Sequence, residues 1–341
     1  MPHTTDRRRV AARRRLTGEP SRLAVAGLPE RGQRARVSER QQILQAVLLE
    51  SFAGPQGLNV WDPRGGRTLA ALFNYWDWVS PQPDRLIIAC SAPERVAAYL
   101  LPYTGSRGED LRNCTGIPGL RVETLTRTSV LLRHLPTGGT LEVGGDDRRV
   151  RESTFHSEVS HVRSDEERYL EPAWRSSGLT SGEEMWESAW HKRPCDPLLS
   201  TLMGALSVLL YQSSDGDTPQ GVVGLAAAQS PLESRSISQA PVPKWAKELE
   251  VVRGGRSSAT STFSWIGGIP ADVLAGILTG EEVGTDGTID SRACEHVAVV
   301  RRGSAALVLQ RLSDRPFWAT DRPRRDMSRS LDATCPACLR P

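Results

Sequence analysis

The sequence predicts a mixed α/β protein in which two folded parts follow a basic tail. Its 341 residues leave room for about two domains, and 38% of them are apolar, which is enough for a sizeable core. Short apolar runs alternate with helical patterns along the chain. The expected parts are a basic flexible tail at 1–36, an α+β domain at 37–165 and an α/β domain at 166–341. We find no convincing internal repeat of fixed period.

The tail at 1–36 is the most basic segment of the chain. It holds ten arginines against three acidic residues, although the whole chain has a net charge of only +3. Such a segment can bind nucleic acid or anionic lipid by releasing counterions, and the alternative is a solvated, partly helical tail. The apolar run at 23–28 is too short for a signal peptide, and the run at 198–211 is too short to cross a bilayer. We therefore expect a cytoplasmic protein that is not an integral membrane protein.

Residues 37–165 carry clear local signals for helices, strands and turns. Ser38 can cap a helix that ends near Gly54, and Pro93 fits the first turn of a second helix that ends at Leu101. Apolar runs separated by turn residues predict the strands. These strands are expected at 58–61, at 86–90, twice within 120–135, and at 140–143 after a turn at 136–139.

The sequence pattern of residues 166–341 differs from that of residues 37–165. A segment at 164–193 is predicted to be helical and charged, and longer apolar runs follow it. Strands and helices alternate after that segment, so we expect a parallel α/β core between 195 and 312. The expected elements are a helix at 198–210 and strands at 222–228, 272–278 and 296–300.

A phosphate-binding loop of the Walker type is not recognisable. Such a loop needs glycines followed by Lys and by Ser or Thr. The chain has three lysines, Lys192, Lys244 and Lys247, and none of them follows a glycine. The nearest approach, Arg-Gly-Gly-Arg-Thr at 64–68, lacks the lysine, and its alternative interpretation is a hairpin turn.

A zinc site is suggested by the last two cysteines, Cys335 and Cys338. Their spacing allows both thiolates to bind one zinc ion, but a structural site needs four ligands. His191 and Cys195 or another subunit could supply the rest, and the alternative is a metal-free end. No Ser-His-Asp or Cys-His arrangement can be inferred, because nothing marks one Ser or Cys as activated.

Short motifs between 135 and 341 follow one another in an order that resembles a known family. They are Arg-Val-Arg-Glu-Ser-Thr at 149–154, Ser-Gly-Leu-Thr-Ser-Gly at 177–182, Ser-Pro-Leu-Glu at 230–233, Ala-Asp-Val-Leu-Ala-Gly at 271–276, His-Val-Ala-Val-Val at 296–300, Arg-Leu-Ser-Asp at 311–314 and Cys-Pro-Ala-Cys at 335–338. In this order they resemble the ATPases that drive type II secretion and type IV pilus assembly.

The resemblance implies a RecA-like P-loop NTPase domain at 166–341 that binds ATP and Mg²⁺. It implies that Asp272 and Glu281 are the catalytic acids of a Walker B segment. It also implies that Ser200 and Thr201 begin the helix after the phosphate loop, and so lie in the nucleotide-binding region. The segment in place of that loop, at 193–197, has neither Gly nor Lys.

Further departures fall where catalysis would lie. The acidic pair before Pro231 is replaced by Gln229 and Ser230, and Ile277 stands where the family has Glu unless an insertion moves that role to Glu281. These losses remove groups that phosphoryl transfer requires. We therefore expect a degenerate, catalytically inactive relative of the secretion and pilus motors that acts as an assembly or regulatory subunit. Its protein partners would form a homo-oligomer, or a hetero-oligomer with an active paralogue. The alternatives are a nucleic-acid-associated protein of a mobile element, which would use the tail at 1–36, and an enzyme of unrecognised type.

Overall fold

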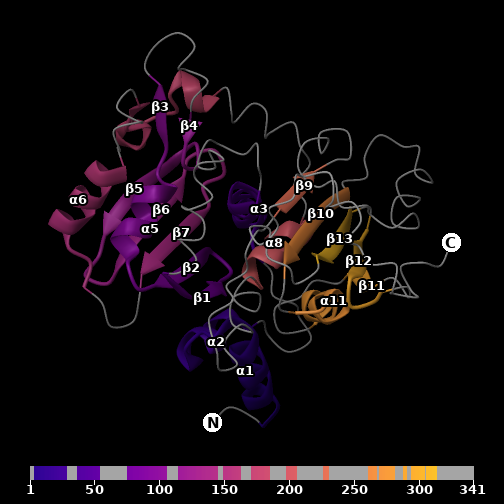
Figure 1. The fold of residues 1–341 in the computed structure, drawn as a ribbon. Coiled ribbons are helices and arrows are strands. Elements are labelled where there is room, and N and C mark those ends of the chain that lie inside the picture. Colours follow the sequence, from indigo (N-terminus) through magenta and orange to yellow (C-terminus); the bar gives the residue numbers. More distant parts are fainter. Residues whose placement is uncertain are drawn as a thin grey trace, which may run out of the picture.

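The computed structural model describes residues 4–28, 37–53, 75–105, 114–144, 149–162, 170–184, 197–205, 226–229, 260–266, 269–280, 287–289, 293–303 and 305–312. These residues form two five-stranded sheets and one three-stranded sheet, together with helices. Figure 1 shows the two larger sheets on either side of the helices α3 (Glu39–Ala53) and α8 (Pro197–Gly204). The prediction of a mixed α/β structure is therefore confirmed.

The first lobe is built on a sheet with the order β1-β2-β7-β6-β5. Strands β2 and β7 are parallel, and the other neighbours are antiparallel. Helix α5 follows β2 and packs on the sheet. The bounds are β1 (Trp76–Pro81), β2 (Arg85–Cys90), α5 (Pro93–Leu100), β5 (Leu120–Leu125), β6 (Ser129–His134) and β7 (Thr140–Gly144).

Local signals place most elements of the first lobe where the sequence predicts them. The Ser38 hydroxyl accepts a hydrogen bond from the Gln41 backbone N–H at 3.3 Å at the start of α3. Pro93 occupies the first turn of α5, where its missing N–H costs nothing. The turn between β6 and β7 contains Gly138 with a φ of +68°, a conformation that glycine adopts without strain. The strand predicted at 58–61 lies outside the described residues.

The second lobe is built on a sheet with the order β11-β12-β13-β10-β9. Only β10 and β13 are parallel, so the predicted parallel core is wrong for the described strands. The physical reason is the short turn at Gly303, because so short a connection can join β12 and β13 only as antiparallel neighbours. The bounds are β9 (Ala226–Gln229), β10 (Thr260–Ile266), β11 (Thr288–Ile289), β12 (Val297–Arg302) and β13 (Ala305–Leu312).

The apolar run at 272–278, predicted as a strand, is instead part of helix α11 (Ala271–Thr279). Leu274, Ala275 and Leu278 are buried, and this spacing places them on one face of a helix. Pro270 precedes the helix and takes the N-cap position. A run this short is compatible with either element, and contact with β12 and β13 selects the helix.

The two lobes repeat one arrangement, which the sequence does not reveal as a repeat. In the described residues each five-stranded sheet is built from a helix, two strands, a second helix and three more strands, with β3 and β4 inserted after α5 in the first lobe. The strand order and directions are the same in both sheets. Helix α3 touches β9 of the second lobe, and its counterpart α8 touches β1 of the first. The equivalent elements are α3 and α8, β1 and β9, β2 and β10, α5 and α11, β5 and β11, β6 and β12, and β7 and β13.

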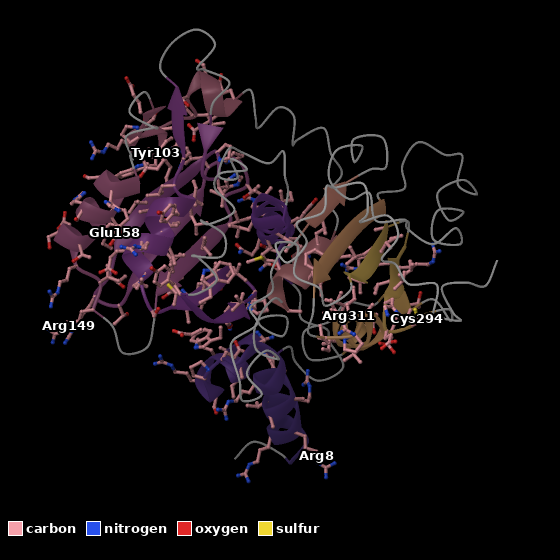
Figure 2. The ribbon with its side chains drawn as sticks, viewed as in Figure 1. Arg8, Tyr103, Arg149, Glu158, Cys294 and Arg311 are labelled. Atoms are coloured by element: carbon pink, nitrogen blue, oxygen red, sulfur yellow. The ribbon has the colours of Figure 1, made fainter. Side chains whose placement is uncertain are left out.

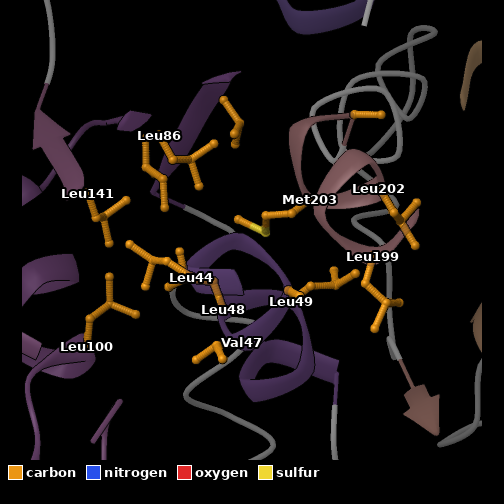
Figure 3. Packing of buried hydrophobic residues seen from close by; sticks show 14 of the residues in the cluster. Leu44, Val47, Leu48, Leu49, Leu86, Leu100, Leu141, Leu199, Leu202 and Met203 are labelled. Atoms are coloured by element: carbon orange, nitrogen blue, oxygen red, sulfur yellow. The ribbon is translucent and has the colours of Figure 1, made fainter. Parts of the chain in front are cut away.

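The core runs continuously through the contact between α3 and α8. Figure 3 shows Leu44 of α3 facing Leu86 and Leu141 of the first sheet, and Leu49 facing Leu199 of α8. All five side chains belong to one buried apolar cluster that includes residues of both lobes. The lobes are therefore joined by a shared core and not only by the polypeptide chain.

The three-stranded sheet and two helical segments complete the first lobe. Helix α6 (Glu152–Val162) packs on α5. The segment at 164–193, predicted as helical, contains in its described part a short strand, a 3-10 turn and one helical turn, because Pro172 and Gly178 interrupt it. The sheet consists of β3 (Tyr103–Gly105), β4 (Cys114–Thr115) and β8 (Leu170–Glu171).

The tail at 1–36 contains two helices, α1 (Thr4–Thr17) and α2 (Ser21–Gly27), which pack on each other and on β1. Its described part is therefore docked on the first lobe and is not a free flexible tail. None of the helices in the described residues is long and apolar enough to span a membrane.

Candidate functional site

A surface cleft between α5 and α6 gathers polar side chains of the first lobe. Its volume is about 390 Å³, and Arg95, Ser157, Glu158, Ser160 and His161 line it. Helix α6 supplies four of these residues, because the pairs 157 with 160, 157 with 161 and 158 with 161 are three or four residues apart and so are neighbours on one side of the helix. Figure 2 shows Glu158 on this side of the first lobe, away from the second sheet.

Arg95 lines the cleft and bonds to two neighbouring side chains, Glu158 and Tyr75. Its Nε and Nη2 donate to the two carboxylate oxygens of Glu158 at 2.9 and 3.1 Å, and its Nη1 donates to the Tyr75 hydroxyl at 2.8 Å. The guanidinium also lies 5.6 Å from the centre of the Tyr75 ring. The bonds to Glu158 and Tyr75 raise the pKa of Arg95 above its ordinary value.

The charge of the cleft follows from this pairing. Because Glu158 neutralises Arg95, a phosphate group would meet a carboxylate beside the one arginine among the described lining residues. The serine hydroxyls and the imidazole of His161 can still donate and accept hydrogen bonds. The cleft therefore fits an uncharged polar group, such as a stretch of peptide, better than it fits a nucleotide.

A second polar cluster, built on Arg121 and Glu183, is buried. Nη1 and Nη2 of Arg121 donate to the two carboxylate oxygens of Glu183, each at 2.8 Å. The remaining Arg121 donors reach backbone oxygens of Leu120, Ser176 and Gly178. These contacts pin residues 176–183 to β5, so this cluster is a structural clamp.

Glu183 is held as a carboxylate by its surroundings. Burial by itself raises the pKa of Glu183, but hydrogen bonds from Arg121, Thr180 and Gly119 outweigh that effect, so the pKa lies below its ordinary value. Thr180 and Glu183 also form a capping box, in which each side chain bonds to the backbone N–H of the other.

A third cluster fixes the α1–α2 hairpin to β1 through Arg13. Its side chain is fully buried and donates to Glu19, to the Gly27 carbonyl at 2.9 Å and to the Pro81 carbonyl at 2.6 Å. Glu19 also accepts a hydrogen bond from the Ser80 hydroxyl on β1. One arginine of the predicted basic tail thus has an internal partner and a structural role.

The described residues among those predicted to bind nucleotide lie on two helices, α8 and α11. Ser200 is buried in α8, and its hydroxyl donates to Gln45 Oε1 of α3 at 2.7 Å, so it joins the two lobes. Thr201 is half-buried beside it. Asp272 is exposed in the first turn of α11, where its carboxylate accepts a hydrogen bond from the Val273 N–H at 2.9 Å. A helix start, and not a Walker B strand, therefore holds Asp272.

The remaining predicted site residues, which are Glu281, His191, Cys195, Cys335 and Cys338, lie outside the described residues. Within the part that the structure describes, no group of three or more His, Cys, Asp or Glu is placed to hold a metal ion. The zinc prediction for Cys335 and Cys338 stays a prediction.

Sequence reasoning missed the three clusters around Arg13, Arg95 and Arg121. The pairs Arg95–Glu158 and Arg121–Glu183 join residues 63 and 62 positions apart, which no local pattern reveals. One signal was present, because Thr-x-x-Glu at 180–183 is a capping-box pattern. No protein-family model matches the chain, and no curated protein or solved structure matches it either.

Proposed function

We propose that the protein is a non-catalytic assembly or regulatory subunit that acts by binding other proteins. The observation that carries this proposal is the duplicated fold, in which two lobes of one topology share a core through α3 and α8. A core of this kind holds the outer surfaces of both lobes in a fixed relation. That is the property that a subunit needs in order to position partners.

The side chains support a binding role over phosphate chemistry. Ser200, which the family resemblance placed near the phosphates, is occupied by Gln45 in the contact between the lobes. Asp272 is exposed at a helix start. The cleft at Arg95 is neutral and polar, which suits a segment of a partner protein.

The relation to the secretion and pilus motors enters this proposal as a prediction from the sequence. The resemblance also predicts a RecA-like fold for residues 166–341. Three of the four strand contacts in the second sheet are antiparallel, whereas that fold is expected to have a mainly parallel sheet. The proposal keeps one element of the resemblance, which is the role of a subunit that does not hydrolyse ATP.

Turnover provides the first test. We expect the purified full chain to release no phosphate from ATP above background, and to show no saturable change with a fluorescent ATP analogue, because no lysine follows a glycine anywhere in the chain. Phosphate release well above background that disappears in Glu281→Gln would refute the non-catalytic role.

Complex formation provides the second test. The chain would be co-expressed with the products of its neighbouring genes, and the complexes would be measured by size-exclusion chromatography with light scattering. We expect Ser157→Trp, which fills the cleft, to weaken a complex, and Thr128→Trp, in the exposed turn between β5 and β6 and not part of the cleft lining, to leave it intact. Equal loss in both variants, or no complex with any of these proteins, would contradict the proposal.

A further inference from the structure

The α1–α2 hairpin presents a basic surface at one end of the molecule. Figure 1 shows it below the first sheet, and Figure 2 shows Arg8 pointing away from the body of the protein. Arg7, Arg8 and Arg14 are exposed on α1. Arg7 and Arg14 are seven residues apart, so they lie on one side of the helix, about 10 Å apart along its axis.

The same helix turns its other side inward. Arg13 and Thr17 are fully buried, and Val10 and Ala12 are half-buried. Glu19, the acidic residue of the hairpin whose side chain the structure describes, is itself fully buried and bonded to Arg13. Among the described side chains, three arginines therefore lie on the outward side of α1, while the negative charge of Glu19 is paired inside.

The arrangement of charged and apolar side chains on α1 favours nucleic acid over an anionic membrane as the ligand. A helix that binds a membrane surface inserts an apolar face between the lipids, and the half-buried apolar residues of α1 are on the side turned to the protein. Arginine guanidinium groups fit phosphate oxygens with paired hydrogen bonds. A helix fixed to a folded domain also offers these groups without the loss of chain freedom that a flexible tail incurs on binding.

We infer that the outward side of α1, with Arg7, Arg8 and Arg14, is a binding surface for the phosphate backbone of duplex DNA. The contact is to phosphates, so it selects for charge and shape and not for base sequence. The buried Arg13–Glu19 pair holds the surface in place on β1. This inference goes beyond the assembly role, because it adds DNA to the protein partners and assigns it to the outward side of α1.

The test is the salt dependence of binding to a fluorescently labelled duplex, measured by anisotropy with the full chain. We expect the double variant Arg7→Gln with Arg8→Gln to bind roughly tenfold more weakly and to give a log–log salt slope shallower by about 2, since each lost phosphate contact removes about one unit. The matched control is Arg149→Gln with Arg151→Gln, which removes two exposed arginines far from α1. It should bind as the unaltered chain does.

Two results would overturn the inference. One is equal affinity and slope for the α1 variant and the unaltered chain. The other is binding to vesicles of anionic phospholipid at salt concentrations where the duplex does not bind. Because the substituted side chains are exposed, the melting temperatures of both double variants should match that of the unaltered chain, which separates lost binding from lost folding.

Discussion

The two lobes share a topology but differ in the outer faces of their sheets. In the first lobe the outer face carries charged side chains beside the apolar Ile87, and Arg85 and Glu142 lie across neighbouring strands with 3.5 Å between Nε and Oε2. In the second lobe the equivalent face is apolar and buried, with Val299 opposite Val308. The inner faces of both sheets are apolar and join one core.

This difference shows which pattern fixes the fold and which is free to vary. The inner faces pack against helices in both lobes, so apolar residues are required there in both. On the outer face one lobe accepts ion pairs at its surface and the other buries valines. Outer-face residues thus set what each lobe contacts, and the strand order is maintained without them.

Exchanging one residue between the outer faces gives the largest expected effect. The native Val308 side chain is 3% exposed and belongs to a buried cluster with Val297, Val299 and Ala306. Val308→Glu places a carboxylate among these apolar side chains. We expect the free energy of unfolding to fall by roughly 5 kcal/mol or more, because the charge loses its hydration. The reciprocal change, Glu142→Val, should alter it by no more than about 1 kcal/mol. Chemical denaturation of both variants measures this, and equal effects would mean that the faces do not differ.

The clamp at the outer edge of the first sheet should give the next largest effect. Glu183→Ala leaves the buried Arg121 without its carboxylate, and we expect a loss of about 3 kcal/mol. The same denaturation measurement applies. A loss below about 1 kcal/mol would show that residues 176–183 are not clamped to β5.

Acid should weaken the same clamp by less than the substitution does, because protonation removes the charge of Glu183 but keeps its shape. The pKa of Glu183 is lower in the folded state than its ordinary value of 4.5, so the folded state binds this proton less readily than the unfolded state does. The pair therefore adds stability above about pH 4.5, and this is lost as the pH falls through the lower, folded pKa. Unfolding free energies over this range should fall less steeply in Glu183→Gln than in the unaltered chain, and parallel curves would contradict the assignment.

The exposed pair in the cleft should give the smallest effect. Glu158→Gln removes one partner of Arg95, whose side chain is 37% exposed, so water replaces most of what is lost. We expect a change in the free energy of unfolding of about 0.5 kcal/mol. A change as large as that of Glu183→Ala would show that the cleft is a second clamp and not an open surface.

The sequence predicts the first lobe better than the second because its signals are local. Ser38, Pro93 and Gly138 each act through their own backbone, and the elements beside them lie where expected. In the second lobe, apolar runs such as 297–300 show that both faces of a strand are buried, but they do not show strand direction. The short turn at Gly303 settles the direction of β12 and β13.

The polar clusters were beyond prediction for a different reason. Arg13 lies in a run of arginines that looks uniformly exposed, and only its docking on Pro81 and Gly27 sets it apart from Arg14. Likewise Ser200 looks like a hydroxyl at a helix start until the contact with Gln45 is known. Each of these roles depends on a residue that is distant in the sequence.

The contact between α3 and α8 also has a consequence for stoichiometry. A symmetric homodimer presents every surface twice, so it binds partners in even numbers or extends a symmetric array. Here two copies of one topology are joined in a single chain, and their outer faces have different chemistry. Each outer face therefore occurs once per molecule, so a partner that recognises the charged side chains on the outer face of the first lobe meets one copy of them per chain.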